Sequence, residues 1–67
     1  MSDFKGKVIK IFLNYNNGYV CETGLYIDTR EDFIVIKNVA NEKIQYVPKY
    51  SIKYIEIVKE VGGNDYE

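Results

Sequence analysis

The chain is 67 residues long, which is enough for one small domain. Nine Lys and Arg residues against ten Asp and Glu residues give a net charge of −1, so a polybasic nucleic-acid tail and an acidic disordered tail are excluded. Because the chain has no His, a Ser-His-Asp triad, a Cys-His pair and most zinc sites are excluded as well. We therefore expect no enzyme activity, no metal and no other cofactor.

The single cysteine and the hydropathy of the chain bear on its compartment. Cys21 has no partner for an internal disulfide, which favours a reducing environment, and we expect it to be a small, partly buried apolar group. No apolar run approaches the length of about 18 residues that a membrane-spanning helix needs. The first residues, MSDFKGKV, do not resemble a signal peptide. These features predict a soluble, cytoplasmic domain without membrane contact.

The composition favours strands over helices. The chain contains seven Val, nine Ile, seven Tyr and three Phe, against two Leu and one Ala. Residues that are β-branched or aromatic fit a pleated, half-buried surface, whereas Ala and Leu favour helices. The expected fold class is therefore all-β.

Five segments with alternating apolar residues follow one another along the chain, with short polar turns between them. They span residues 5–15, 19–28, 33–39, 43–47 and 52–58. In the first segment Ile9 and Ile11 share one face, while Val8 and Phe12 make the opposite face partly apolar. In the last segment, Ile52 and Tyr54 are expected to share the less protected face.

Three local signals define how these segments connect. Asn17-Gly18 predicts a tight hairpin, and Gly24 marks a sharp bend or bulge inside the second segment. Pro48 lacks a backbone N–H and ends the fourth segment. Residues 1–60 are therefore expected to form a five-stranded, strongly bent antiparallel SH3-like small barrel. Residues 61–67, with two glycines, are expected to be a flexible C-terminal tail.

The spacing of these segments resembles the Sm-like family, which includes the Sm, LSm and Hfq proteins. Its first motif corresponds to VIKIFLNYNNGYVCETGLYIDTREDFIVIKN, and its second to KIQYVPKYSIKYIEI. The sequence departs from the family in three places. It lacks the helix that usually precedes the first strand, Arg30 stands where the family has Asp, and Pro48-Lys49-Tyr50-Ser51 replaces the usual turn of the second motif.

The resemblance implies a ring whose centre binds a single strand of U- or A-rich RNA. The loop 28–32 and the turn 49–51 would face each other there, with Phe33 or Tyr50 stacking on bases and Arg30 or Lys49 holding phosphates. The alternative is that Phe33 and Tyr50 pack and that the charges solvate turns, since the three carboxylates of this loop repel phosphate. Those carboxylates could instead hold a hard cation, although a solvated acidic turn fits their spacing better.

Seven tyrosines are more than one small barrel can bury, and tyrosine is common at protein interfaces. In Sm-like rings the fourth and fifth strands of neighbouring subunits pair edge to edge. The resemblance therefore implies a subunit interface made by Ile44, Tyr46, Ile52 and Tyr54, in a homo-oligomeric ring of five to seven copies. An open edge is the alternative for these residues. A ring that serves as a structural or protein-binding module, with no role in nucleic-acid binding, is the alternative function.

Overall fold

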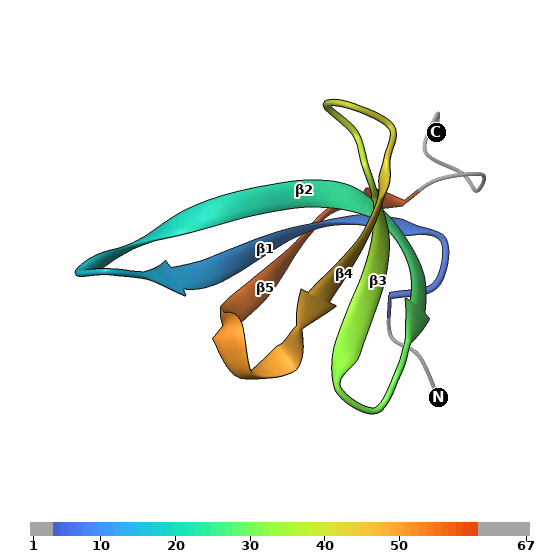
Figure 1. Ribbon diagram of the computed structural model, residues 1–67. Helices are drawn as coiled ribbons and strands as arrows, with labels where there is room; N and C mark the ends of the chain where they lie inside the picture. Colours follow the sequence, from blue (N-terminus) through green and yellow to red (C-terminus); the bar gives the residue numbers. More distant parts are fainter. Residues whose placement is uncertain (1–3, 61–67) are drawn as a thin grey trace.

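Five antiparallel strands in one sheet make up most of the described chain (Figure 1). The structure is a computed structural model that describes residues 4–60. The elements are β1 (Lys7–Tyr15), β2 (Gly18–Thr29), β3 (Phe33–Asn38), β4 (Ile44–Pro48), the single 3-10 turn η1 (Lys49–Ser51) and β5 (Ile52–Glu60). The all-β class with five antiparallel strands is confirmed. The expected tail, residues 61–67, lies outside the described residues.

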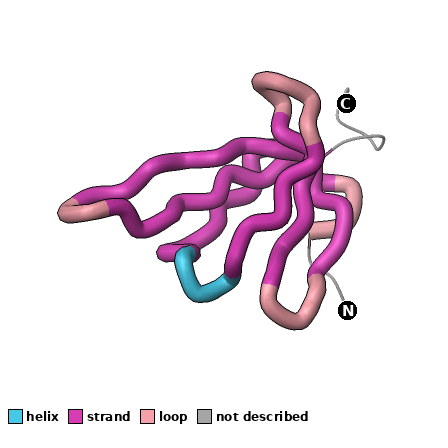
Figure 2. Tube along the Cα trace, viewed as in Figure 1, coloured by secondary structure: helices cyan, strands magenta, loops and turns pink. Residues whose placement is uncertain are grey.

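The strand order β4-β3-β2-β1-β5 places β4 and β5 at opposite edges of the sheet. Nevertheless, only the three residues of η1 join them. The four Cα steps from Pro48 to Ile52 span at most about 14 Å, whereas the edges of a flat five-stranded sheet lie about 19 Å apart. The sheet must therefore curl, as Figure 2 shows. Among residues 4–60, β4 and β5 do not pair with each other, so the sheet is curved but not closed.

The inner face of this curved sheet holds the core. Ile9, Ile11 and Ile36 are fully buried, and Ile34, Tyr26 and Val47 complete the buried cluster. The alternation in the sequence thus predicted the inward-facing residues Ile9 and Ile11 of β1. The opposite face of β1 is also partly apolar as expected, because Val8 and Phe12 are buried there.

The hairpin between β1 and β2 turns one residue earlier than the sequence indicates. Tyr15 pairs with Gly18, so the two connecting residues are Asn16 and Asn17 rather than Asn17 and Gly18. Asn16 adopts the left-handed conformation, with φ of 51°. Asparagine tolerates this conformation better than most residues, which explains why no glycine is needed there.

Gly24 is required by a close approach of two strands. A Cβ atom at this position would lie 2.6 Å from the backbone oxygen of Lys37 on β3. The irregularity of β2 itself falls two to four residues later, between Tyr26 and Asp28. The glycine therefore lets β3 approach β2 closely, and the register shift of β2 is a separate feature.

A second irregularity changes the face of β5. Phe12 pairs with Tyr54 and Leu13 pairs with Ile52, so Lys53 is an extra residue on β5. As a result Ile52 packs against the core, together with Ile55, whereas the Tyr54 ring lies on the other face against Phe12. The expected common face of Ile52 and Tyr54 is wrong, because alternation in the sequence does not reveal a bulge.

No helix within residues 4–60 is long and apolar enough to cross a membrane.

Candidate functional site

The β2–β3 loop and the turn η1 lie next to each other. The Arg30 N–H donates to the carbonyl of Phe33 over 2.7 Å, which closes the loop between β2 and β3. The Lys49 N–H donates to the carbonyl of Asp32 over 2.9 Å, which ties η1 to that loop. Two segments that the sequence places about 17 residues apart are thus joined by backbone hydrogen bonds. This juxtaposition is the one that the sequence predicted for a binding site.

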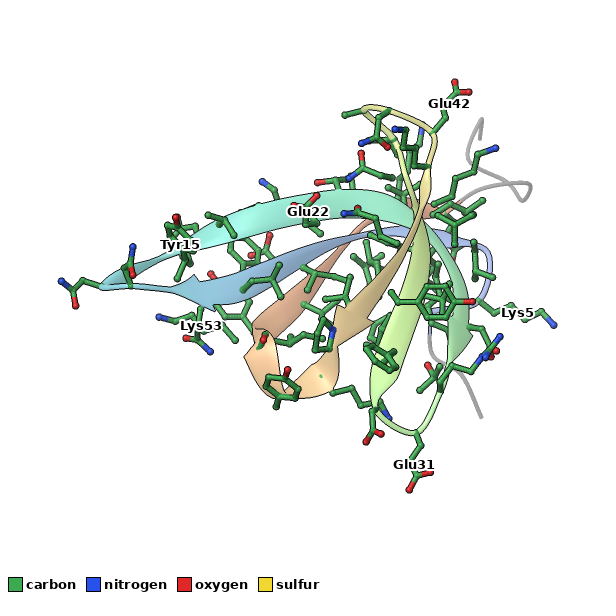
Figure 3. The ribbon with its side chains drawn as sticks, viewed as in Figure 1. Lys5, Tyr15, Glu22, Glu31, Glu42 and Lys53 are labelled. Atoms are coloured by element: carbon green, nitrogen blue, oxygen red, sulfur yellow. The ribbon has the colours of Figure 1, made fainter. Side chains whose placement is uncertain are left out.

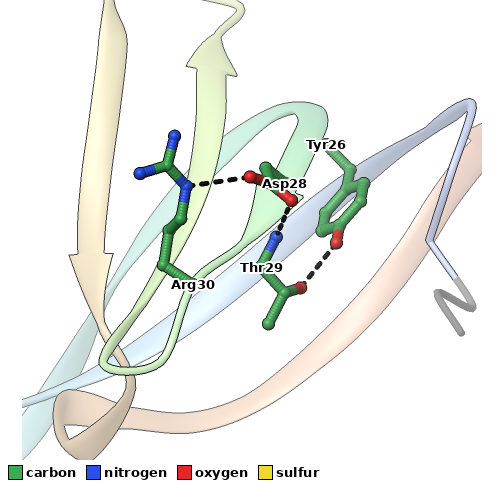
Figure 4. A network of polar contacts seen from close by, with 4 residues as sticks. All are labelled: Tyr26, Asp28, Thr29 and Arg30. Carbon is green, nitrogen blue, oxygen red and sulfur yellow. Dashed lines mark hydrogen bonds and ion pairs between the residues drawn. The ribbon is translucent and has the colours of Figure 1, made fainter.

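Arg30 is held by a carboxylate of its own loop (Figure 4). Its Nε lies 2.8 Å from Asp28 Oδ2, and Asp28 Oδ1 accepts the Thr29 backbone N–H over 2.8 Å. The Thr29 hydroxyl shares a further hydrogen bond with the Tyr26 hydroxyl. The bond from Arg30, followed by that from Thr29, lowers the pKa of Asp28 below its ordinary value of 3.8. The same bond raises the pKa of Arg30, so both groups are ionised at neutral pH.

Tyr46 links the predicted RNA site to the predicted subunit interface. The Arg30 guanidinium lies over the Tyr46 ring, 5.8 Å from its centroid, at a distance typical of a cation–π contact. Phe33 contacts the same ring edge-on, with centroids 6.0 Å apart. The structure therefore brings Arg30, Phe33 and Tyr46 into one cluster on the outer face of β3 and β4, although the sequence assigned them to two sites.

The side chains of η1 remain exposed beside this cluster. Tyr50 is 86% exposed, which is more than any other large apolar residue of the described chain. Lys49 is exposed too. Their backbone position is fixed by the bond from Lys49 to Asp32, whereas their side chains face solvent.

The electrostatics of this cluster favour stacking over phosphate binding. Asp28 already neutralises Arg30, and Glu31 and Asp32 add negative charge to the same loop. Lys49 then remains as the cation of this region that has no carboxylate of residues 4–60 within ion-pair distance. The Tyr50 ring offers an exposed π-face, on which any base can stack. The arrangement can therefore hold an unpaired base more readily than a run of phosphates.

Of the four residues predicted for the subunit interface, three are exposed on the edge strands and one packs against the core. Ile44 and Tyr46 are about half exposed on β4, an edge strand, and Tyr54 is about half exposed on β5, the other edge strand. Ile52 packs against the core. The edge residues Ile57 and Val58, which the sequence did not single out, are also half exposed.

The acidic loop and the cysteine are the two remaining features that the sequence singled out. Within residues 4–60 no three groups of the kinds that ligate metals lie together. Cys21 is free and exposed on β2, so the expectation that it is partly buried is wrong. Its cross-strand neighbour is Phe12, whose ring turns toward Tyr54 and Tyr19.

Sequence reasoning missed one buried polar residue, Asn38. Its Nδ2 donates to Glu22 over 2.8 Å and to Gln45 over 2.7 Å, and its Oδ1 accepts the Ala40 N–H over 2.7 Å. Asn38 therefore holds the start of the β3–β4 hairpin to both neighbouring strands. A shallow hollow of about 300 Å³ beside this hairpin is lined by Leu25, Lys37, Asn38, Val39 and Glu42, and by none of the predicted site residues.

Comparison of the chain with profiles of known protein families, with curated proteins and with solved structures finds no significant match.

Proposed function

We propose that this chain is a divergent Sm-like small barrel that assembles into a homo-oligomeric ring of five to seven copies and binds single-stranded U- or A-rich RNA. The observation that carries the proposal is the position of β4 and β5 at the two free edges of one curled sheet. Each edge strand carries a row of backbone groups without a partner strand inside the described chain.

Pairing β4 of one copy with β5 of the next gives the free backbone groups of both edge strands hydrogen-bond partners. The contact is head-to-tail, so repetition either closes into a ring or grows into a filament. Closure leaves no exposed edge and is the more soluble outcome. The half-exposed Ile44 on β4 and Ile57 on β5 supply apolar side chains to this contact.

In the ring, each copy contributes one cluster of Arg30, Phe33 and Tyr46, with Lys49 and Tyr50 beside it. Exposed aromatic rings support base stacking, worth about 1–3 kcal/mol per base. Because Lys49 is the one cation beside this cluster without a carboxylate contact among the described residues, few phosphates are neutralised there. Binding should therefore depend weakly on salt, with a slope of about one to two ions.

The experiment is fluorescence anisotropy with labelled U-rich and A-rich oligoribonucleotides at two salt concentrations. The parent protein is compared with the double variant Lys49→Ala, Tyr50→Ala. A matched control, Lys5→Ala with Tyr15→Ala, removes one exposed lysine and one exposed tyrosine from elsewhere (Figure 3).

We expect the site variant to bind at least about fivefold more weakly than the parent, from the loss of one stacking contact. The control should bind as the parent does. Equal binding by the site variant and the parent contradicts the site. A ring that binds neither oligonucleotide supports the second candidate, a protein-binding ring, which the neutralisation of Arg30 by Asp28 favours.

A further inference from the structure

A second exposed aromatic surface lies on the sheet face opposite the core, across β2, β1 and β5. Phe12 on β1 stacks on Tyr54 of β5, with centroids 4.3 Å apart and rings inclined by 24°. Tyr19 of β2 meets the Phe12 ring edge-on at 5.3 Å. Phe12 is only 6% exposed because the two tyrosines cover it, whereas each tyrosine is about half exposed. We call these three residues the aromatic face.

The aromatic face is held in place before any partner arrives. Each of its rings contacts another, and all three stand on strands that pair directly at these positions or beside them. Aromatic side chains that are already packed lose little conformational entropy on binding. They are also the residue types that most often dominate the energy of an interface.

The charges around the aromatic face are balanced. Lys10 lies beside it, with its Nζ 5.6 Å from the Phe12 centroid, and its cross-strand neighbour on β5 is Glu56. The other neighbours on β1 and β2 are small and uncharged, Asn14, Cys21 and Thr23, and Lys59 stands further along β5 on the same face, opposite Val8. A surface whose nearest charges are one cation and one anion does not favour a polyanion such as RNA. It is complementary to a copy of itself turned by 180°, where Lys10 meets Glu56 of the other copy.

We infer that two copies of this chain associate face to face through Phe12, Tyr19 and Tyr54, with Lys10 of each copy opposite Glu56 of the other. This contact differs from edge pairing. Side chains stand roughly perpendicular to the sheet, whereas edge pairing uses the backbone within it. A copy with both edges paired therefore still presents its aromatic face.

The size of the aromatic face sets the strength of the contact. Three strands about 4.8 Å apart and five residues along β1 cover a few hundred Å² at most, below the roughly 800 Å² per partner of a stable complex. One pair of faces is therefore weak. In a ring whose aromatic faces all point to one side, several faces act together, so two such rings stack more firmly than two single copies. The stability of the stack, though not the contact itself, rests on the proposed ring.

The test is sedimentation velocity of the parent and of Tyr19→Ser, at about 10 μM and about 1 mM, concentrations that bracket a weak contact. Tyr15→Ser is the matched control. Tyr15 is 59% exposed and Tyr19 56%, both stand at the end of the β1–β2 hairpin, and Tyr15 points to the opposite face of the sheet. Circular dichroism checks that both variants are folded.

We expect Tyr19→Ser to halve the mass of the parent assembly, from two stacked rings to one, and Tyr15→Ser to leave the mass unchanged. If no ring forms, a dimer of the parent at the higher concentration that Tyr19→Ser abolishes supports the contact and contradicts only the ring. A parent mass that Tyr19→Ser does not change at either concentration overturns the contact. If Tyr19→Ser loses RNA binding while its mass stays that of the parent, the contact between copies is also overturned, and the aromatic face binds nucleic acid instead.

Exchanging the charges of Lys10 and Glu56 tests whether the partner of the aromatic face is a second copy of this chain. Lys10→Glu makes this face negative, and Glu56→Lys makes it positive, so each variant alone should fail to associate through it. An equimolar mixture of the two should associate face to face as the parent does. A mixture that stays at the mass of the separate variants contradicts the proposed pairing of Lys10 with Glu56.

Discussion

The side chain of Arg30 is shared between a carboxylate and an aromatic ring, and this sharing decides what the candidate site can bind. Arg30 contacts Asp28 at 2.8 Å and lies over Tyr46. A phosphate must compete with Asp28 for the same guanidinium. Arg30 therefore contacts Tyr46 and Asp28 at the same time, and under the proposed function Asp28 weakens the hold of Arg30 on RNA.

Asp28→Asn should therefore tighten RNA binding, by about twofold to fivefold, the range expected for one exposed charge contact. Glu31→Gln is the control, because it removes the same charge from the same loop without releasing Arg30. Anisotropy titrations of both variants measure the difference. Equal tightening by the two substitutions would show that only the net charge of the loop matters.

Gly24 offers a second test at a single residue. Gly24→Ala places a Cβ atom 2.6 Å from a backbone oxygen of β3, so the two strands must move apart. We expect a loss of about 1–3 kcal/mol in the free energy of unfolding, measured by urea denaturation. Gly18→Ala meets nothing within 4 Å and should change the stability by less than about 0.5 kcal/mol. A neutral Gly24→Ala would contradict the close approach of β2 and β3.

Among the elements, the β3–β4 hairpin depends on the buried amide of Asn38. Asn38→Ala leaves the polar groups of Glu22 and Gln45 without their donor and should cost about 1–3 kcal/mol of stability. Asn41→Ala, which removes one exposed hydrogen bond to the Lys43 N–H, should cost less than half as much. Thermal and urea denaturation compare the two variants. Similar losses in both would contradict a special role for the buried amide.

The strands themselves could be predicted from the sequence, because their signal is local. Alternation at Ile9 and Ile11 identifies an inward face, and Pro48 is the last residue of β4 as expected. The bulge at Lys53 could not be predicted, since an extra residue in one strand shows only against its partner.

The candidate site could be predicted only in part, because some of its contacts depend on how the strands pair. The turn 49–51 and the loop 28–32 were expected together from the resemblance, and the structure joins them by a backbone hydrogen bond. The contact of Tyr46 with Arg30 and Phe33 depends on the cross-strand register of β3 and β4, which no spacing along the chain reveals. The aromatic face likewise brings together Phe12, Tyr19 and Tyr54 from three strands.

At the scale of the whole molecule, the proposed assembly depends on the free edges of β4 and β5. Ile44→Lys adds a charge to the β4 edge, a change by which natural proteins block edge pairing. We expect light scattering to give the mass of a single chain for this variant. Val39→Lys is the control, since Val39 is as exposed as Ile44 but lies in the β3–β4 loop. Assembly that survives Ile44→Lys unchanged would contradict an interface along β4.

The most direct test of edge-to-edge assembly is the mass of the parent protein in solution, measured by light scattering at micromolar concentration. One chain has a mass of 7.8 kDa. The proposed ring predicts five to seven times this mass, or twice that value when two rings stack through their aromatic faces. A stable species of 7.8 kDa at this concentration would contradict assembly through β4 and β5 and leave a single curled sheet with two open edges.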